Sequence, residues 1–258
     1  MMCLVALKTN LRVQGIVHKA TTYLLAQRSP TWSWNYWDRS SSPSTRFPDD
    51  LDTTTTALTA ITIHTPEHLT DDVLLTFVNN LISNEVYEGG PYFTWMTPSR
   101  LRDAWDDVDG IVNSNIHFFL KQHEIFLERL DDFLKHTLSD QSLTSRYTRR
   151  IHRCFFLSKN CTGRAKKELL QLLVRSYPNI TNPLDRALFI TTYLTLDGNP
   201  QKISHEVTRL LKTNLRDLDP HSLFVEDLRE GSPLSTPSRG LTVAAMIQAI
   251  TLYENKKT

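Results

Sequence analysis

Residues 50–64 read Asp-Leu-Asp-Thr-Thr-Thr-Thr-Ala-Leu-Thr-Ala-Ile-Thr-Ile-His, and this stretch decides the fold class. Between Asp52 and His64 it holds only small, apolar and hydroxyl-bearing side chains, with no charged face. A helix without a charged face must be surrounded by protein rather than by water. We therefore expect residues 50–64 to form an inner helix of an all-helical protein.

Outward from this stretch, weakly charged segments take turns with amphipathic ones. The weakly charged segments are 10–27, 50–64, 109–121, 147–158, 183–196 and 238–253. The amphipathic segments lie between most of them, at 66–84, 122–138, 165–176 and 200–213. Six inner helices alternating with outer helices predict an all-α (α/α)6 barrel, which we expect to fill residues 1–258 as a single domain. A helical solenoid is the structural competitor, since its repeats would have a similar period.

The composition is that of an ordinary soluble protein, with 40% hydrophobic residues and a net charge of +1. Interspersed charges argue against a nucleic-acid partner, which would require clustered Lys and Arg. Three cysteines are too few for a disulfide framework or a zinc site. We expect no transmembrane segment, because no apolar run approaches about 20 residues. The apolar run at residues 1–7 is too short for a signal peptide, so a cytoplasmic location is predicted.

Two loops lead into inner helices. Loop 29–49 is rich in Ser and Pro and holds four large aromatic residues within the six positions 32–37, namely Trp32, Trp34, Tyr36 and Trp37. Loop 88–110 carries a Glu-Gly-Gly-Pro-Tyr run and then a cluster of aspartates. Long loops in compact proteins are usually functional or disordered, and the aromatic residues favour an ordered loop that packs over something. Inner helices of an α-barrel start at one end, so we expect both loops to converge on one mouth.

The aspartates at residues 49–52 allow two interpretations. Asp is a preferred N-cap and suits the positive end of a helix dipole, and Asp49 is the better placed of the two candidates for a cap. Capping does not explain Asp52, which would lie one turn inside an apolar helix. A carboxylate there is costly unless it is paired, hydrogen-bonded or protonated. A helix cap and a functional acid both stay open at this point.

The chemistry that requires such an acid is protonation of an alkene or an epoxide. An apolar cavity and the neighbouring Asp50 would keep the proton on the acid, while the helix N-terminus would stabilise the anion left behind. The resulting cation needs aromatic faces and the exclusion of water. The candidate aromatic residues are Trp32, Trp34, Trp37, Tyr92 and Trp95.

The motif Asp50-Leu51-Asp52-Thr53-Thr54 resembles the DxDTT acid motif of class II terpene cyclases of the drimenyl diphosphate synthase type. The commoner DxDD form would have Asp in place of Thr53. The resemblance to the squalene-cyclase/prenyltransferase superfamily is best over residues 32–120 and weaker towards the end of the chain. Its further motifs are Trp34-Asn35-Tyr36-Trp37, Glu88-Gly89-Gly90-Pro91-Tyr92, Asp107-Val108-Asp109, Val112-Asn113-Ser114-Asn115 and Gly231-Ser232-Pro233-Leu234.

The resemblance implies a barrel of the type called the β domain in that family. It implies that Asp52 donates the proton, that Asp50 supports it, and that Asn113 and the aromatic residues bind an isoprenoid, such as a prenyl diphosphate that keeps its head group. Mg²⁺ would help to bind the head group, with Glu88, Asp107 and Asp109 as candidate contacts. The chain has no room for the second, γ domain of full-length cyclases. A homodimer, a partner or loop 29–49 would have to close the cavity.

Other chemistries fit the sequence less well. Residues 106–109 have the wrong spacing for the DDxxD metal motif of ionising terpene synthases, and no cysteine lies near partners for a zinc site. Two alternatives to the cyclase stay open. One is an (α/α)6 glycan-active enzyme with a carboxylate pair across the barrel mouth. The other is a non-catalytic α-barrel that serves as a binding module.

Overall fold

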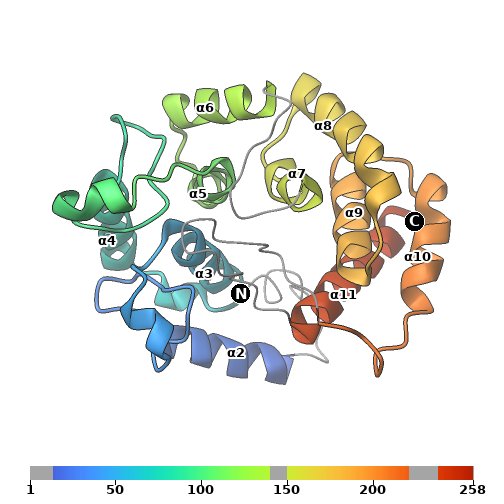
Figure 1. Cartoon of the computed structure of the whole chain (residues 1–258), viewed down its shortest axis with the longest axis horizontal. Helices are drawn as coiled ribbons and strands as arrows, with labels where there is room; N and C mark the ends of the chain where they lie inside the picture. Colours follow the sequence, from blue (N-terminus) through green and yellow to red (C-terminus); the bar gives the residue numbers. More distant parts are fainter. Residues whose placement is uncertain (1–13, 140–149, 221–237, 258) are drawn as a thin grey trace. The chain divides into compact units, whose positions relative to one another are not determined.

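The computed structural model of the chain describes residues 14–139, 150–220 and 238–257 (Figure 1). The described residues form α-helices and short 3-10 turns, joined by loops that hold only isolated β-bridges. This confirms the all-α class. The motif at residues 231–234 and Cys3 lie outside the described residues.

The helical segments of the sequence are confirmed one by one. The weakly charged segments form α2 (Gln14–Ala26), α3 (Leu51–His64), α5 (Gly110–Gln122), α7 (Arg150–Ser158), α9 (Pro183–Thr195) and α11 (Arg239–Lys257). The amphipathic segments form α4 (Asp71–Ile82), α6 (Glu128–Ser139), α8 (Gly163–Ser176) and α10 (Ser204–Leu211). The 3-10 turns are η2 (Ser42–Thr45), η3 (Pro66–His68), η4 (Ser99–Ala104), η5 (Tyr177–Asn179) and η6 (Pro200–Ile203).

The chain divides into two compact units, residues 1–137 and 138–258. In the first unit α3 packs against α2 and α5, and Figure 1 shows α3 and α5 side by side. α4 joins them through Phe77, whose ring meets Phe119 of α5 edge to face with centroids 5.0 Å apart. Edge-to-face packing and full burial of both rings make this contact a large part of the core.

In the second unit α9 is the central helix and contacts α7, α8, α10 and α11. It begins at Asn182, whose side chain accepts from the Asp185 N–H, followed by Pro183 in the first turn. Pro suits the first helical position because its missing N–H would have no partner there. Leu184 and Leu188 are almost completely buried, as expected for a helix that is surrounded on most sides. The prediction that a single domain fills residues 1–258 stays a prediction.

The contrast between inner and outer helices is confirmed for most of them. α3, α5 and α9 bury most of their residues, whereas α4 buries only Val73, Phe77 and Leu81 along one stripe. α2 and α11 are exceptions, because α2 buries only Thr21 and Leu24 and α11 buries only six of its 19 residues. Low charge along a helix therefore does not by itself predict that other parts of the protein surround it.

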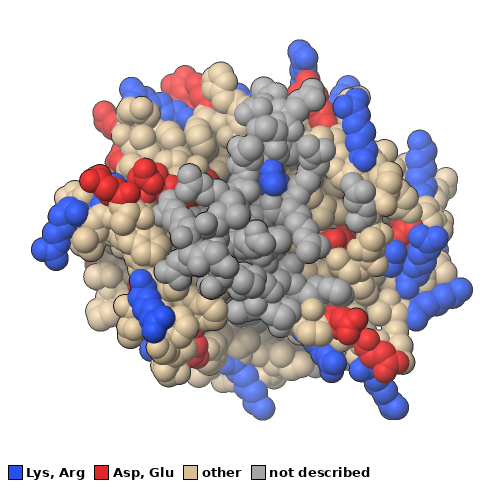
Figure 2. Space-filling model, in the orientation of Figure 1, with Lys and Arg blue, Asp and Glu red and all other residues tan. Residues whose placement is uncertain are grey.

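The charges on the surface are interspersed, as the composition predicts. Figure 2 shows Lys and Arg interspersed with Asp and Glu over the described part of this face. None of the helices within residues 14–139, 150–220 and 238–257 is long and apolar enough to span a bilayer.

Candidate active site

Asp50 caps helix α3. Its backbone is extended, and its Oδ1 accepts a hydrogen bond of 2.6 Å from the Thr53 N–H. The preference for Asp49 as the cap is therefore wrong. Asp49 instead forms an ion pair with Arg39, at 2.7 Å between Nη2 and Oδ2. The N-cap is the residue whose carbonyl accepts the first hydrogen bond of the helix. Two adjacent aspartates in a sequence do not reveal which of them occupies that position.

Three chain segments meet at Asp50. Isolated antiparallel bridges join it to Trp34 on one side and to Trp95 on the other. The Asp50 N–H donates to the Trp34 carbonyl at 3.1 Å, and the Leu51 N–H donates to the Thr94 carbonyl at 2.8 Å. The structure therefore brings both predicted loops to the start of α3. These bonds hold the backbone at the acid motif from two directions, which is the preorganisation that a reactive group requires.

The Asp50 carboxyl group is buried and only partly satisfied. The residue is 4% exposed, and its Oδ2 has no hydrogen-bond partner among the described residues. Burial, together with the charge of Asp52, raises the pKa of Asp50 to about 8, although the hydrogen bond from Thr53 acts in the opposite direction. Burial has this effect because the charged form loses the most solvation. This shift favours the protonated form of Asp50 at pH 7.

Asp52 lies in the first turn of α3 and is half-buried. Its Oδ1 accepts a hydrogen bond of 2.7 Å from Nδ2 of Asn115 on α5. An amide donor favours a carboxylate, and its effect grows where water is scarce. The side chain is thus oriented from the neighbouring helix, and it is more accessible than Asp50.

Trp34 belongs to the core of the first unit. It is 1% exposed and donates from Nε1 to the Leu24 carbonyl at 2.8 Å. Trp32 is half-buried, contacts Trp34 edge to face, and lies under the Arg28 guanidinium at 5.0 Å from the ring centroid. Of these two tryptophans, Trp34 contributes mainly to packing, and Trp32 keeps part of its surface open.

The remaining aromatic candidates lie in separate contacts. Trp95 packs edge to face against Trp105 with centroids 4.9 Å apart, and Phe47 of loop 29–49 contacts both rings. Trp37 meets Tyr36 edge to face at 5.3 Å. Aromatic residues of both loops therefore pack together around Trp95, which is bridged to Asp50. This packing supports an ordered loop 29–49. The role of that loop as a lid stays a prediction.

Asn113 and Tyr92 hold the second loop to α5. Asn113 is fully buried, its Oδ1 accepts from the Tyr92 N–H at 2.8 Å, and its Nδ2 donates to the carbonyls of Tyr92 and Asp109. Burial and the charge of Glu85 raise the pKa of Tyr92 to about 12. The amide of Asn113 is occupied by backbone groups, so its geometry supports a structural role at this position.

The Gly-Gly-Pro run before Tyr92 has a backbone reason. Gly89 and Gly90 have φ angles of +82° and +96°, which favour glycine. A Cβ atom on Gly90 would lie 3.0 Å from Cε2 of Tyr92. The run therefore allows the turn that presents Tyr92 to Asn113.

The predicted magnesium contacts have other surroundings. Asp107 Oδ2 accepts from the Thr94 hydroxyl at 2.9 Å, and Asp109 caps α5 through the Ile111 N–H at 2.7 Å. Glu88 is exposed. No group of three or more His, Cys, Asp or Glu among the described residues is placed to hold a metal ion. The contacts of Glu88, Asp107 and Asp109 with Mg²⁺ stay a prediction, and no step below depends on them.

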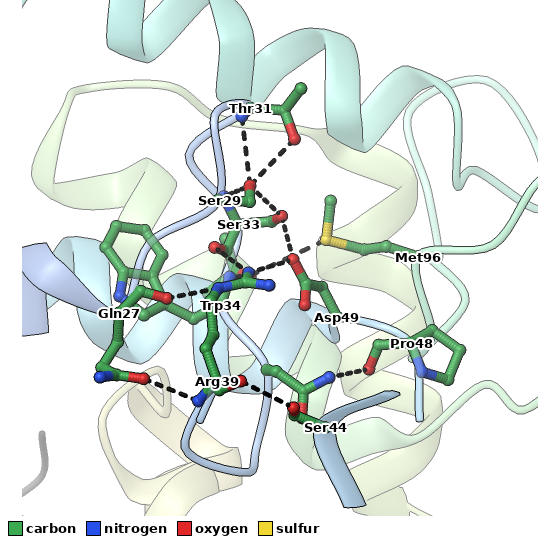
Figure 3. A network of polar contacts seen from close by, with 12 residues as sticks. Gln27, Ser29, Thr31, Ser33, Trp34, Arg39, Ser44, Pro48, Asp49 and Met96 are labelled. Atoms are coloured by element: carbon green, nitrogen blue, oxygen red, sulfur yellow. Dashed lines mark hydrogen bonds and ion pairs between the residues drawn. The ribbon is translucent and has the colours of Figure 1, made fainter. Parts of the chain in front are cut away.

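Sequence reasoning missed Asn115 and the role of Asp49. Asn115 lies in the same motif as Asn113, and only the rotation of α5 decides which amide faces α3. Asp49 belongs to a network in loop 29–49, in which its Oδ2 accepts from the Ser33 hydroxyl and from Arg39 (Figure 3). An Arg ten residues before an Asp, inside a polar loop, was the available signal.

Comparison of the chain with protein-family models, with curated proteins and with solved structures gives no match. The resemblance to class II terpene cyclases therefore stays a prediction, and the function is argued from the geometry of the site.

Proposed function

We propose that the chain is a class II terpene cyclase-like enzyme that protonates an isoprenoid and so starts its cyclisation. Asp52 is the proton donor and Asp50 is its neutral neighbour. One observation carries the proposal: Asp50 is a buried carboxyl group with a pKa of about 8 and one oxygen without a partner among the described residues. A structural cap requires neither property. Paired carboxyl groups with different environments are typical of acid catalysis.

The two carboxyl groups divide the work. The reaction starts from the state in which both carboxyl groups are protonated. The neutral Asp50 then places no negative charge beside Asp52, so the departure of the Asp52 proton is not opposed. When the Asp52 O–H bond breaks, a C–H bond forms at an alkene carbon of the substrate and a carbocation results. Asn115 stabilises the new Asp52 carboxylate through its 2.7 Å hydrogen bond, and the N-terminus of α3 adds a favourable dipole.

The surroundings of the same site support the proposed substrate class. A carbocation is compatible with aromatic faces and with little water, and the Trp95 and Trp105 rings lie beside the segment that bridges to Asp50. We propose a prenyl diphosphate whose head group is retained, as the resemblance implies. The (α/α)6 barrel, its closure by a homodimer or by loop 29–49, and the cytoplasmic location belong to this proposal.

The test is product analysis with the full-length protein. Farnesyl and geranylgeranyl diphosphate are incubated with the parent protein and with Asp52→Asn, with and without Mg²⁺. The products are dephosphorylated and identified by mass spectrometry. We expect a cyclic alcohol from the parent alone, and only after dephosphorylation, which would mean that the diphosphate was retained. Linear prenyl alcohols in every reaction would contradict the proposal, and release of sugars in a parallel incubation with oligosaccharides would favour a glycan-active enzyme.

A further inference from the structure

Arg39 connects three chain segments next to the acid site. Its Nε donates to the Gln27 carbonyl at 2.7 Å, just beyond the end of α2. Its Nη2 donates to the Ser33 carbonyl at 3.1 Å and to Asp49 Oδ2 at 2.7 Å (Figure 3). Its backbone N–H donates to Gln27 Oε1 at 2.8 Å. A planar guanidinium can make such divergent contacts, whereas a single ammonium group cannot make them all.

Asp49 is held from both sides directly before the acid motif. Its side chain accepts from Arg39 and from the Ser33 hydroxyl, and its carbonyl accepts from the Met96 N–H at 2.9 Å. The next residue, Asp50, is bridged to Trp34, which follows Ser33. The contacts of Arg39 therefore brace the same two segments that the bridge at Asp50 joins.

Arg39 also supplies the compensating charge at this point. Asp49 and Asp52 flank Asp50 in the sequence, and the ionised form of either one raises the pKa of Asp50, after the larger effect of burial. Two further charged groups lie in the segments that adjoin Asp50. Asp107 contacts Thr94, and Arg39 contacts Asp49. The Arg39 and Asp49 side chains are 35% and 16% exposed, so solvent screens this ion pair in part.

We propose that Arg39 is a positioning residue of the acid site, which acts through Asp49 by fastening the beginning of loop 29–49 to its end, where the chain enters α3, and by neutralising the charge next to Asp50. Its effect on catalysis rests on the proposed function, whereas its effect on Asp50 does not. The second effect can be measured without any substrate.

The experiment is a titration of Asp50 by NMR in protein labelled with ¹³C at the aspartate carboxyl group, with Asp50→Asn used to assign the signal. The variants are Arg39→Gln, Arg39→Lys, Asp49→Asn and the double variant Arg39→Gln/Asp49→Asn. We expect Arg39→Gln to raise the Asp50 pKa by a few tenths of a unit, roughly the scale of a part-exposed ion pair. Asp49→Asn should lower it, and the double variant should match Asp49→Asn.

The variants separate the two parts of the role. Arg39→Lys keeps the charge, so the Asp50 titration should stay near that of the parent. It loses contacts to Gln27 and Ser33, so limited proteolysis within residues 29–49 should become faster. If Arg39→Gln does not fold, Arg39→Lys and Asp49→Asn still report on the two effects.

Some outcomes would overturn the proposal. An unchanged Asp50 titration in Arg39→Gln would exclude the electrostatic role, and an equal shift in the Asp49→Asn background would show that Arg39 does not act through Asp49. With an active substrate, the pH profile of kcat should shift in the direction of the NMR pKa while KM changes little. A failed cyclase assay would leave the NMR result standing, so the two failures are distinguishable.

Discussion

Asp50 in the first unit and Glu206 in the second are equally inaccessible, at 4% and 1% exposure, yet their surroundings differ in every other respect. Glu206 accepts hydrogen bonds from Tyr177, from Arg186 Nε at 2.6 Å and from Arg209 Nη1 at 3.0 Å. Burial acts to raise the pKa of Glu206, but the hydrogen bonds from Tyr177 and Arg186 outweigh it and the pKa is lowered. Asp50 accepts from the backbone and side chain of Thr53, has no cation in contact with it among the described residues, and the carboxyl group of Asp52 acts to raise its pKa.

The difference shows which surroundings distinguish a buried carboxylate from a buried carboxyl group that retains its proton. A buried carboxylate that ties helices together is surrounded by donors and cations, as Glu206 is between α9 and α10. A carboxyl group that retains its proton lacks those partners, because each one would favour the ionised form. Burial by itself therefore does not distinguish the two roles, whereas the partners do.

The largest expected effect concerns the reaction. Asp52→Asn keeps the shape of the side chain but removes the transferable proton, so turnover of the correct isoprenoid should fall by about 10²- to 10⁴-fold. Asp72→Asn is the matched control, because Asp72 also lies in the first turn of a helix of the first unit but is exposed. Steady-state kinetics with both variants checks this. Equal turnover in Asp52→Asn and the parent would remove the acid mechanism.

The next effect concerns stability in the second unit. Glu206→Gln leaves the Arg186 guanidinium, 16% exposed, without its charge partner, and should cost about 3 kcal/mol of unfolding free energy. Because the pKa of Glu206 is lowered on folding, its contribution is present above the ordinary glutamate pKa and is lost as the pH falls through the folded value. Denaturant unfolding at pH 7 measures the cost. A loss below about 1 kcal/mol would mean that Glu206 does not stabilise the unit.

A third effect distinguishes Asp50 from Glu206, because their contributions to the unfolding free energy depend on pH with opposite signs. Asp50 binds a proton on folding, because its pKa rises to about 8 from an ordinary value of about 3.9. Its contribution to stability is complete below about pH 4 and is lost as the pH rises towards 8, with a slope of at most about 1.4 kcal/mol per pH unit.

Asp50→Asn caps a helix as well as Asp does and lacks this titration. The variant should therefore gain stability relative to the parent as the pH rises from about 4 to 8. Unfolding curves of both proteins at a series of pH values check this. Parallel pH profiles for the two proteins would mean that Asp50 ionises normally.

The smallest effect tests whether an ion pair without burial matters. Arg164 and Glu168 on α8 form a pair of 2.7 Å, but their side chains are 92% and 48% exposed. Glu168→Gln should change the unfolding free energy by at most about 0.5 kcal/mol, because water screens exposed pairs. It serves as the matched control for Glu206→Gln in the same unit. A cost close to that of Glu206→Gln would show that pairing rather than burial decides.

Much of the fold could be predicted from the sequence, because helix period and charge pattern are local properties. The weakly charged and amphipathic segments were placed close to their observed bounds throughout the described residues. The exposure of α2 was not predictable in the same way. Low charge shows that a helix can tolerate burial, but it does not show which other segments surround the helix. The residues of the candidate site could be named from the sequence, but the contacts that each of them makes could not.

From the sequence alone we could predict the all-helical class, the candidate motif at residues 50–54 and the two aromatic loops that lead into α3 and α5. Only the tertiary structure decided that Asp50 rather than Asp49 is the cap, that Asn115 rather than Asn113 faces Asp52, and that Arg39 braces Asp49. The physical reason is range. Helix formation depends on neighbours within a few turns, whereas the partner of a polar side chain is chosen by packing between segments far apart in the chain, here 63 residues for Asp52 and Asn115.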